Sequence, residues 1–299
     1  MGYGTVLTPV LLLFNFDPIV FVPAVLLSEI FANLVSSLFH VLLKNITLGS
    51  NKDTHNSYIT SECNPHNSSN TNTKTNSENE NNNINTPETA FQRFICRLRN
   101  LTEDTKIIII MAVFGVIATI VSSILNAVFA YSTIATFIIK IYIGVMVLSM
   151  GGLILIMKPS KHFSIRKVVF FGALAGFNKG LSGGGYGPIT VSGQLISGRD
   201  GRQAIGTTSL SEGITCVVGF ITYIITEVIY SNVNDVPFNY AIFELTSYLI
   251  VGVVLAAPLA ALTVKKIENE ILKKGIAIAT AILGILTLLK AILSYVGIW

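Results

Sequence analysis

The residues best suited to chemistry form the run SGGGYG at 182–187, which a shorter GYG at 2–4 repeats near the start of the chain. Successive glycines open backbone conformations that other residues avoid, and they let a ligand approach main-chain amides. Between two short helices, such amides and the positive helix end suit a small anion. Glycines also permit plain close packing of helices, but the recurrence of the break favours a substrate site. The expected binding residues are Gly2, Tyr3, Gly4, Ser182, Gly183, Gly184, Gly185, Tyr186 and Gly187.

Two carboxylates lie inside apolar stretches, and each directly follows a serine: Glu29 after Ser28, and Glu212 after Ser211. A carboxylate in such a setting is costly and is by default a functional candidate. We expect these four residues to couple transport to protons. The alternative is a neutral carboxyl group that is hydrogen-bonded across helices or lies nearer the membrane surface, and the sequence leaves both interpretations open.

Polar residues beside these groups have competing interpretations. Asn178 and Lys179 precede the glycine run and are also expected to bind the substrate. Lys179 could attract an anion or balance Glu212; otherwise it is a lysine that reaches to the membrane surface. Asp17 and Asp200 stand in polar turns and are expected to cap helices. His40 near the end of its apolar segment is expected to be a hydrogen-bonded residue of the interface.

The elements around these residues are membrane-spanning helices. The 299 residues are 51% hydrophobic and 12% charged, whereas a soluble domain carries about 25% charged residues. Apolar runs reach the roughly 20 residues that a spanning helix needs. The expected spans are 19–43, 107–130, 132–157, 204–230, 238–262 and 275–298, with shorter apolar pieces at 5–14, 168–181 and 188–197.

An internal repeat relates the two halves of the chain. A shift of 183 residues aligns GYG at 2–4 with GYG at 185–187 and LSE at 27–29 with LSE at 210–212, without a gap. The nine identities over positions 2–35 exceed the roughly two or three that chance predicts.

Basic residues set the expected orientation of the two copies. The basic loops 158–167 and 263–274 should be cytoplasmic, and 231–237, which has Asp235 and no lysine or arginine, should be external. The segment 168–197 then enters and leaves on the inner side, and the turn 15–18 lies outside. The copies therefore have opposite orientation, as in many secondary transporters. Counting 168–197 as one crossing gives parallel copies and puts the basic loop 263–274 outside, which makes it the second choice.

Residues 45–106 differ in kind from the rest of the chain. They are rich in Asn, Thr and Ser and are expected to form a polar, largely disordered cytoplasmic loop. No catalytic triad, nucleotide-binding loop or redox ligand set is recognisable in the sequence, so we expect neither an enzyme nor a cofactor or metal. The basic residues sit at membrane boundaries, which argues against a nucleic-acid partner.

The stretch at 172–213, GALAGFNKGLSGGGYGPITVSGQLISGRDGRQAIGTTSLSEG, resembles the TauE/SafE sulfite exporter family, and residues 2–30 resemble the family's N-terminal copy. The resemblance implies transport of sulfite, sulfonates or related small organosulfur anions, coupled to an ion gradient. The first copy lacks the arm that 168–184 supplies in the second, so we expect translation to start upstream of Met1.

The sequence thus predicts an all-α, multi-pass protein of the cell membrane built from two inverted repeats, 1–157 and 168–299. Each repeat has three transmembrane helices and a glycine-broken re-entrant hairpin, of which the first lacks its N-terminal arm. The expected function is secondary transport of a small anion. An anion channel and a non-transporting anchoring or assembly subunit are the alternatives. The sequence leaves a homo-oligomer open.

Overall fold

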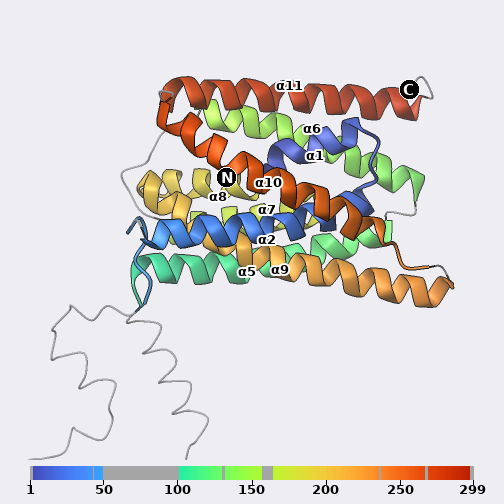
Figure 1. The fold of residues 1–299 in the computed structure, drawn as a ribbon, viewed down its shortest axis with the longest axis horizontal. Helices are drawn as coiled ribbons and strands as arrows, with labels where there is room; N and C mark the ends of the chain where they lie inside the picture. Colours follow the sequence, from blue (N-terminus) through green and yellow to red (C-terminus); the bar gives the residue numbers. More distant parts are fainter. Residues whose placement is uncertain are drawn as a thin grey trace, which may run out of the picture. The chain divides into compact units, whose positions relative to one another are not determined.

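Every regular element of the computed structural model is an α-helix, over the residues that the structure describes: 3–42, 44–49, 101–129, 132–156, 164–235, 237–266 and 269–296. The helices are α1 (Tyr3–Leu13), α2 (Pro18–Leu42), α5 (Glu103–Phe129), α6 (Thr133–Ile156), α7 (Ile165–Ser182), α8 (Tyr186–Ile196), α9 (Gly201–Asn234), α10 (Ala241–Lys266) and α11 (Asn269–Tyr295). Figure 1 shows them as a bundle of long helices around the shorter α1, α7 and α8. The helices of both sequence halves belong to one compact unit, residues 1–46 with 107–299.

Five helices of the described chain are long and apolar enough to cross a membrane, which confirms the predicted membrane architecture for α2, α5, α6, α9 and α11. The sixth predicted span, 238–262, coincides with α10. The apolar helical segment that the structure describes there is Ala241–Val253, which is shorter than a span. The polarity of α5 is inverted relative to a soluble helix. It exposes Ile109, Val113, Ile117, Val121 and Val128, and it buries Thr119, Ser122, Ser123 and Asn126. Apolar residues that face outward at helical spacing are suited to contact with lipid.

The helix boundaries follow the internal repeat. Under the shift of 183 residues, α1 (Tyr3–Leu13) coincides with α8 (Tyr186–Ile196), and the start of α2 at Pro18 coincides with the start of α9 at Gly201. The helices therefore begin and end at equivalent positions in both copies, although of the four turn residues only Asp17 and Asp200 are identical. In the second half, the described helix α7 precedes α8.

Two pairs of helices, each with one helix from either half of the chain, pack in opposite directions. Residue numbers fall along α2 as they rise along α9: His40 contacts Gly206, Ser36 bonds Ser209, Glu29 bonds Cys216, and Leu26 lies against Gly219. The pair α6 and α11 behaves likewise, with contacts of Phe137 with Tyr295, Gly144 with Leu288, and Gly151 with Ala281. Both pairs are therefore antiparallel, and they lie side by side in Figure 1.

The helices α7 and α8 form a hairpin around the glycine run. Gly183 and Gly185 adopt left-handed backbone angles, with φ of 76° and 82°, which residues with a side chain rarely adopt. At the open end of the hairpin, the Ser164 N–H donates to the Ser197 carbonyl at 3.2 Å. The chain therefore enters and leaves this hairpin at the same level.

Described residues at the two ends of the polar insert are tied together. The Thr47 N–H donates to Asp104 at 2.9 Å, and the Thr102 hydroxyl donates to the Thr47 carbonyl at 2.6 Å. The predicted disordered loop itself lies largely outside the described residues. The insert therefore leaves and rejoins the chain at neighbouring points.

Close packing of α7 on α5 requires glycine at position 176. A Cβ built on Gly176 lies 2.2 Å from the Gly115 carbonyl oxygen and 2.6 Å from the Gly115 Cα, which are backbone atoms that cannot rotate away. We expect Gly176→Ala to cost about 1–3 kcal/mol of stability, the range for overpacked sites, and to lower the melting temperature of the protein in detergent.

The matched control is Gly152→Ala in α6, where the added Cβ meets nothing within 4 Å. This substitution should be neutral or gain up to about 1 kcal/mol, because alanine is the better helix former. Equal melting temperatures for the two variants would contradict the proposed contact of α5 with α7.

Candidate functional site

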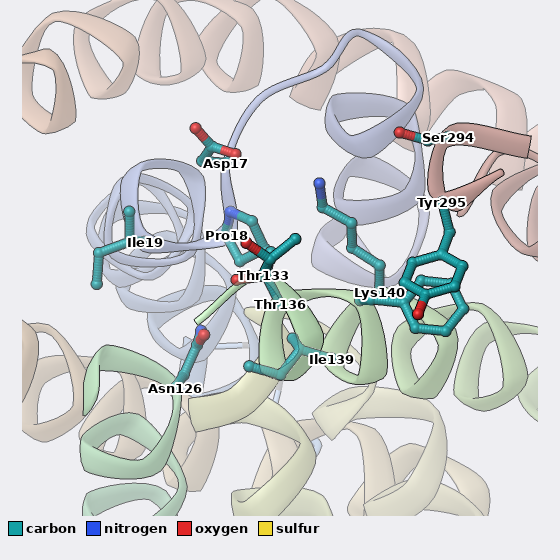
Figure 2. A pocket seen from close by; sticks show the side chains of 11 residues that line it. Asp17, Pro18, Ile19, Asn126, Thr133, Thr136, Ile139, Lys140, Ser294 and Tyr295 are labelled. Atoms are coloured by element: carbon teal, nitrogen blue, oxygen red, sulfur yellow. The ribbon is translucent and has the colours of Figure 1, made fainter. Parts of the chain in front are cut away.

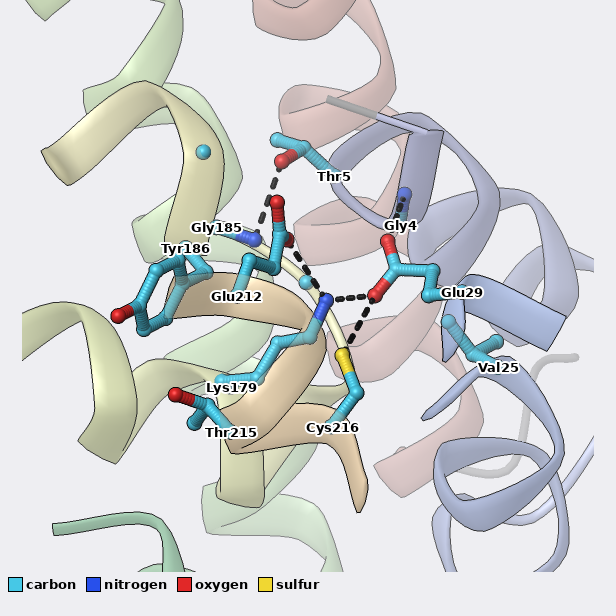
Figure 3. Close-up of polar contacts among 12 residues, drawn as sticks. Gly4, Thr5, Val25, Glu29, Lys179, Gly185, Tyr186, Glu212, Thr215 and Cys216 are labelled. Atoms are coloured by element: carbon cyan, nitrogen blue, oxygen red, sulfur yellow. Dashed lines mark hydrogen bonds and ion pairs between the residues drawn. The ribbon is translucent and has the colours of Figure 1, made fainter. Parts of the chain in front are cut away.

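Three charged side chains from three helices meet in the interior of the bundle. The Lys179 ammonium on α7 pairs with Glu29 on α2 and, at 3.0 Å, with Glu212 on α9 (Figure 3). The exposed fraction of Lys179 is 0%, and those of Glu29 and Glu212 are 4% and 5%. Lys179 therefore does not reach the membrane surface but balances both predicted carboxylates. We call these three residues the charged triad.

The surroundings of the two carboxylates differ. Glu29 accepts three interactions: the Gly4 N–H at 2.9 Å, the Lys179 ammonium, and the Cys216 thiol at 3.6 Å. Among the described residues, Glu212 has only its bond to Lys179. With one ammonium and two carboxyl groups, a fully ionised triad carries one net negative charge in a site removed from water, where unpaired charge is costly.

The two predicted glycine segments are in direct contact beside the triad. The Gly185 N–H donates to the Thr5 hydroxyl at 3.0 Å, and the Thr8 hydroxyl donates to the Ser182 carbonyl at 2.9 Å. A Cβ built on Gly184 falls 2.6 Å from the Gly4 carbonyl oxygen. The absence of side chains on both glycines therefore lets the start of α1 approach the connection between α7 and α8.

At the C-terminal end of each short helix, a lysine from another helix donates to the last carbonyl. The carbonyl of Leu13, the last residue of α1, accepts from Lys290 at 2.5 Å, and the carbonyl of Ile196, the last residue of α8, accepts from Lys167 at 3.4 Å. Leu13 and Ile196 are equivalent in the repeat. A cation at the C-terminal end complements the helix dipole, whose positive end then lies at the N-terminus. The positive ends of α1 and α8 start at Tyr3 and Tyr186, next to the glycine segments.

The other predicted residues occupy distinct places. Asn178 is buried and accepts a hydrogen bond from the Tyr142 hydroxyl, and the Ser182 hydroxyl donates to the Asn178 carbonyl at 2.7 Å. Tyr3 is half-buried and faces Ser28. Gly187 is buried in the first turn of α8, where its carbonyl accepts from Thr190. Gly2 lies outside the described residues.

The two serines before the carboxylates bond within their own helices. Ser28 donates to the Val25 carbonyl at 2.8 Å, and Ser211 donates to the Thr208 carbonyl at 3.0 Å, so each bonds the residue three positions before it. Neither hydroxyl bonds Glu29 or Glu212 in the described structure. The serines are thus placed beside the triad without being part of its hydrogen bonding.

Tyr186 points away from the triad. Its ring is fully buried, and its hydroxyl lies beside Gly115 of α5 and Thr215 of α9 (Figure 3). That hydroxyl has no hydrogen-bond partner among the described residues. If Tyr186 contacts substrate, it must do so through its backbone or after a rearrangement.

Asp200 and His40, the polar residues outside the site, are both hydrogen-bonded. Asp200 caps α9, because its carboxylate accepts from the Arg202 N–H at 2.9 Å, as expected. His40 is hydrogen-bonded to the Asn45 side chain at 3.1 Å. Sequence reasoning missed Thr5, Thr8 and Cys216. Only the position of Cys216, one helical turn after Glu212, could have indicated a shared face.

Comparison with known proteins decides the family. The protein-family model described as "Sulfite exporter TauE/SafE" matches residues 89–287, more than half of the chain. The chain belongs to the TauE/SafE family. The match includes α7, α8 and α9, which carry Lys179 and Glu212. The helices α1 and α2 precede the matched residues, so the TauE/SafE resemblance of residues 2–30 rests on the internal repeat.

No curated protein and no solved structure matched the chain. TauE/SafE membership and the five apolar helices identify a multi-pass membrane protein.

Proposed function

We propose that this chain is a secondary transporter, and not an enzyme, that moves a small sulfite- or sulfonate-like anion together with protons. The observation that carries the proposal is the pairing of Lys179 with both Glu29 and Glu212 at the contact between two glycine segments. The family's description as a sulfite exporter supports a sulfur oxyanion as substrate. The positive ends of α1 and α8 favour an anion at the same place.

Charge balance gives a route to proton coupling. An anion that binds the Lys179 ammonium competes with the carboxylates that already occupy it. The carboxylate that loses its partner is then a buried charge without compensation, and protonation removes this cost. One proton would therefore be taken up with each monovalent anion. Glu212 is the candidate for this role, since Lys179 is its single described partner, whereas Glu29 keeps Gly4 and Cys216.

The substrate contacts proposed from the sequence complete this site. The backbone of 2–4 and of 182–187 would bind the anion, Asn178 and Lys179 would contribute from α7, and Ser28 and Ser211 would lie beside the coupling carboxylates. Their support is proximity: the described members of both segments are joined through Thr5 and Thr8.

Two inverted repeats, 1–157 and 168–299, are the architecture we propose. Antiparallel packing of the equivalent helices α2 and α9 supports it, because a two-fold axis in the membrane plane reverses the direction of each element. The hairpin of α7 and α8, whose open ends meet at Ser164 and Ser197, supports a re-entrant segment.

The contacts also agree with the sides assigned from charge. The turn 15–18 is predicted external. The start of α6 and the end of α11 are then external as well, because each is one span away from a basic loop that is predicted cytoplasmic. Residues from all three segments line one cavity. His40 and Ile46, predicted internal, contact Gly206 at the internal end of α9. The segments 198–203 and 231–237 lie at opposite ends of α9, whose 34 residues extend about 50 Å.

Glu212→Gln tests the coupling. In proteoliposomes, the wild type should accumulate methanesulfonate when the outside is acidic, and the variant should lose at least about tenfold of this accumulation. Methanesulfonate keeps its single charge across the pH range, so the gradient acts on the protein alone. Exchange of labelled for unlabelled methanesulfonate at equal pH should persist, because glutamine still leaves Lys179 available.

The control is Glu244→Gln, the same substitution at an exposed carboxylate in the first turn of α10. It should accumulate substrate as the wild type does. Undiminished pH-driven accumulation by Glu212→Gln would refute the coupling role. A wild-type flux that never saturates and ignores the pH gradient would instead identify an anion channel.

A further inference from the structure

A second space for a ligand lies apart from the charged triad, with a cavity volume of about 410 Å³. Its walls come from the turn before α2, the last turns of α5, the start of α6 and the end of α11 (Figure 2). None of the triad or glycine-run residues lines it. The volume lies within the range of about 300–1,000 Å³ that small-molecule sites occupy.

The cavity contains a lysine without a protein partner. Lys140 lies on α6, is half-buried, and makes no hydrogen bond or ion pair within the described part of the chain. A cation in an apolar segment normally pairs with an anion or with backbone carbonyls, because its desolvation is costly. Figure 2 shows the Lys140 side chain directed into the space between α6, α11 and the turn before α2. The missing counter-charge is the first indication of an anionic ligand.

A second lysine and two hydroxyl groups lie in or next to the cavity. Lys290 on α11 is buried and donates to the Leu13 carbonyl, and a small space of about 20 Å³ next to it is shared with Lys140 and Ser294. Hydroxyl groups of Thr133 and Ser294 also line the cavity and can donate to oxygen atoms of a ligand.

The charge of the walls limits the charge of the ligand. Among the described residues, Asp17 is the one carboxylate that lines the cavity, and it is exposed. A monovalent anion can pair with Lys140, whereas a second negative charge on the ligand would find no further lysine or arginine among the described lining residues and would lie near Asp17.

The wall of the cavity also leads toward the glycine run. Asn126 lines the cavity, and its side-chain amide donates to the Leu181 carbonyl at 3.0 Å and to the Tyr223 hydroxyl at 2.6 Å. Leu181 precedes Gly183 by two residues. A ligand in the cavity is therefore separated by one side-chain layer from the backbone that enters the glycine run.

We propose that this cavity is a second binding site for a small monovalent oxyanion, with Lys140 as its charge partner. If the proposed transport function holds, the site lies on the external side of the transporter. The same oxyanion chemistry is offered by a free anion and by the phosphate of a lipid headgroup, so the experiment must distinguish these sources.

Equilibrium dialysis of methanesulfonate against the full-length protein in neutral phosphatidylcholine nanodiscs provides the test. The wild type should bind two anions per chain, and Lys140→Gln should bind one, with affinity at the lost site reduced at least about tenfold, as for the loss of a charge-assisted hydrogen bond. Lys274→Gln, at an exposed lysine in the first half of α11, should still bind two. Ser294→Phe fills the cavity at an exposed position without removing charge and should also bind one.

Native mass spectrometry of protein extracted with phosphatidylglycerol gives the lipid arm. A loss of one bound lipid in Lys140→Gln, with methanesulfonate binding unchanged, would assign the site to a headgroup phosphate. If both Lys140→Gln and Ser294→Phe bind as much methanesulfonate and as much phosphatidylglycerol as the wild type, the site does not exist. Should the transport proposal fail, the wild type would bind one anion and Lys140→Gln none, so the two failures are distinguishable.

Discussion

Replacing Lys179 by methionine is expected to reduce methanesulfonate flux to background and to lower the melting temperature in detergent by roughly 10 °C. Methionine has similar length but no charge, so Glu29 and Glu212 lose the ammonium that balances both of them. Removal of one partner from a buried ion pair costs about 3–5 kcal/mol. For a domain of this size, 1 kcal/mol shifts the melting temperature by about 2–4 °C. Flux in proteoliposomes and thermal unfolding measure the two effects.

A second variant separates folding from transport. Lys179→Met combined with Glu29→Gln and Glu212→Gln contains no charge in the triad, and neutral replacements of a buried ion cluster are often neutral or stabilising. The melting temperature should therefore recover while flux stays at background. Lys179→Met protein that transports at the wild-type rate would rule out the lysine as the anion's charge partner.

The sequence predicted the elements of this fold well because the membrane dictates them. Spanning helices need long apolar runs, and the turns between them retain charges and helix caps, such as Asp200 before α9. The repeat supplied a second, independent signal. A shift found from identities in 2–35 also relates the bounds of α1 to those of α8, although most aligned positions differ in sequence.

The partners within the site could not be predicted from local sequence. Lys179 meets Glu29 over a separation of 150 residues, and this contact depends on how α2, α7 and α9 pack. Thr5 and Thr8 resemble ordinary helix residues, and only the approach of Gly184 to Gly4 turns them into partners of the glycine run. Lys140 lies in an apolar span without a neighbouring motif, and its cavity is formed by elements far apart in the sequence.

Contact between the two glycine segments leads to the second large effect, which is expected for Gly184→Ala. The added methyl group would lie 2.6 Å from the Gly4 carbonyl oxygen and 3.1 Å from the Thr5 Cα, both of them backbone atoms of the first turn of α1. Ordinary contact needs 3.4–4 Å, so the segments must separate by about 1 Å, and the Gly185–Thr5 bond must lengthen. A displacement of 1 Å at a binding constellation can cost about 100-fold in rate.

Methanesulfonate flux through Gly184→Ala should accordingly fall by about two orders of magnitude, while α1, as a short helix of 11 residues, can shift without unfolding the bundle. Gly252→Ala on α10 is the matched control, because a Cβ there meets nothing within 4 Å, and it should transport as the wild type does. If Gly184→Ala keeps flux within twofold of Gly252→Ala at equal amounts of folded protein, the two glycine segments do not bind substrate jointly. If only Gly184→Ala loses flux, and its melting temperature is largely retained, the close approach of the two backbones is needed for binding the anion and not for the stability of the bundle.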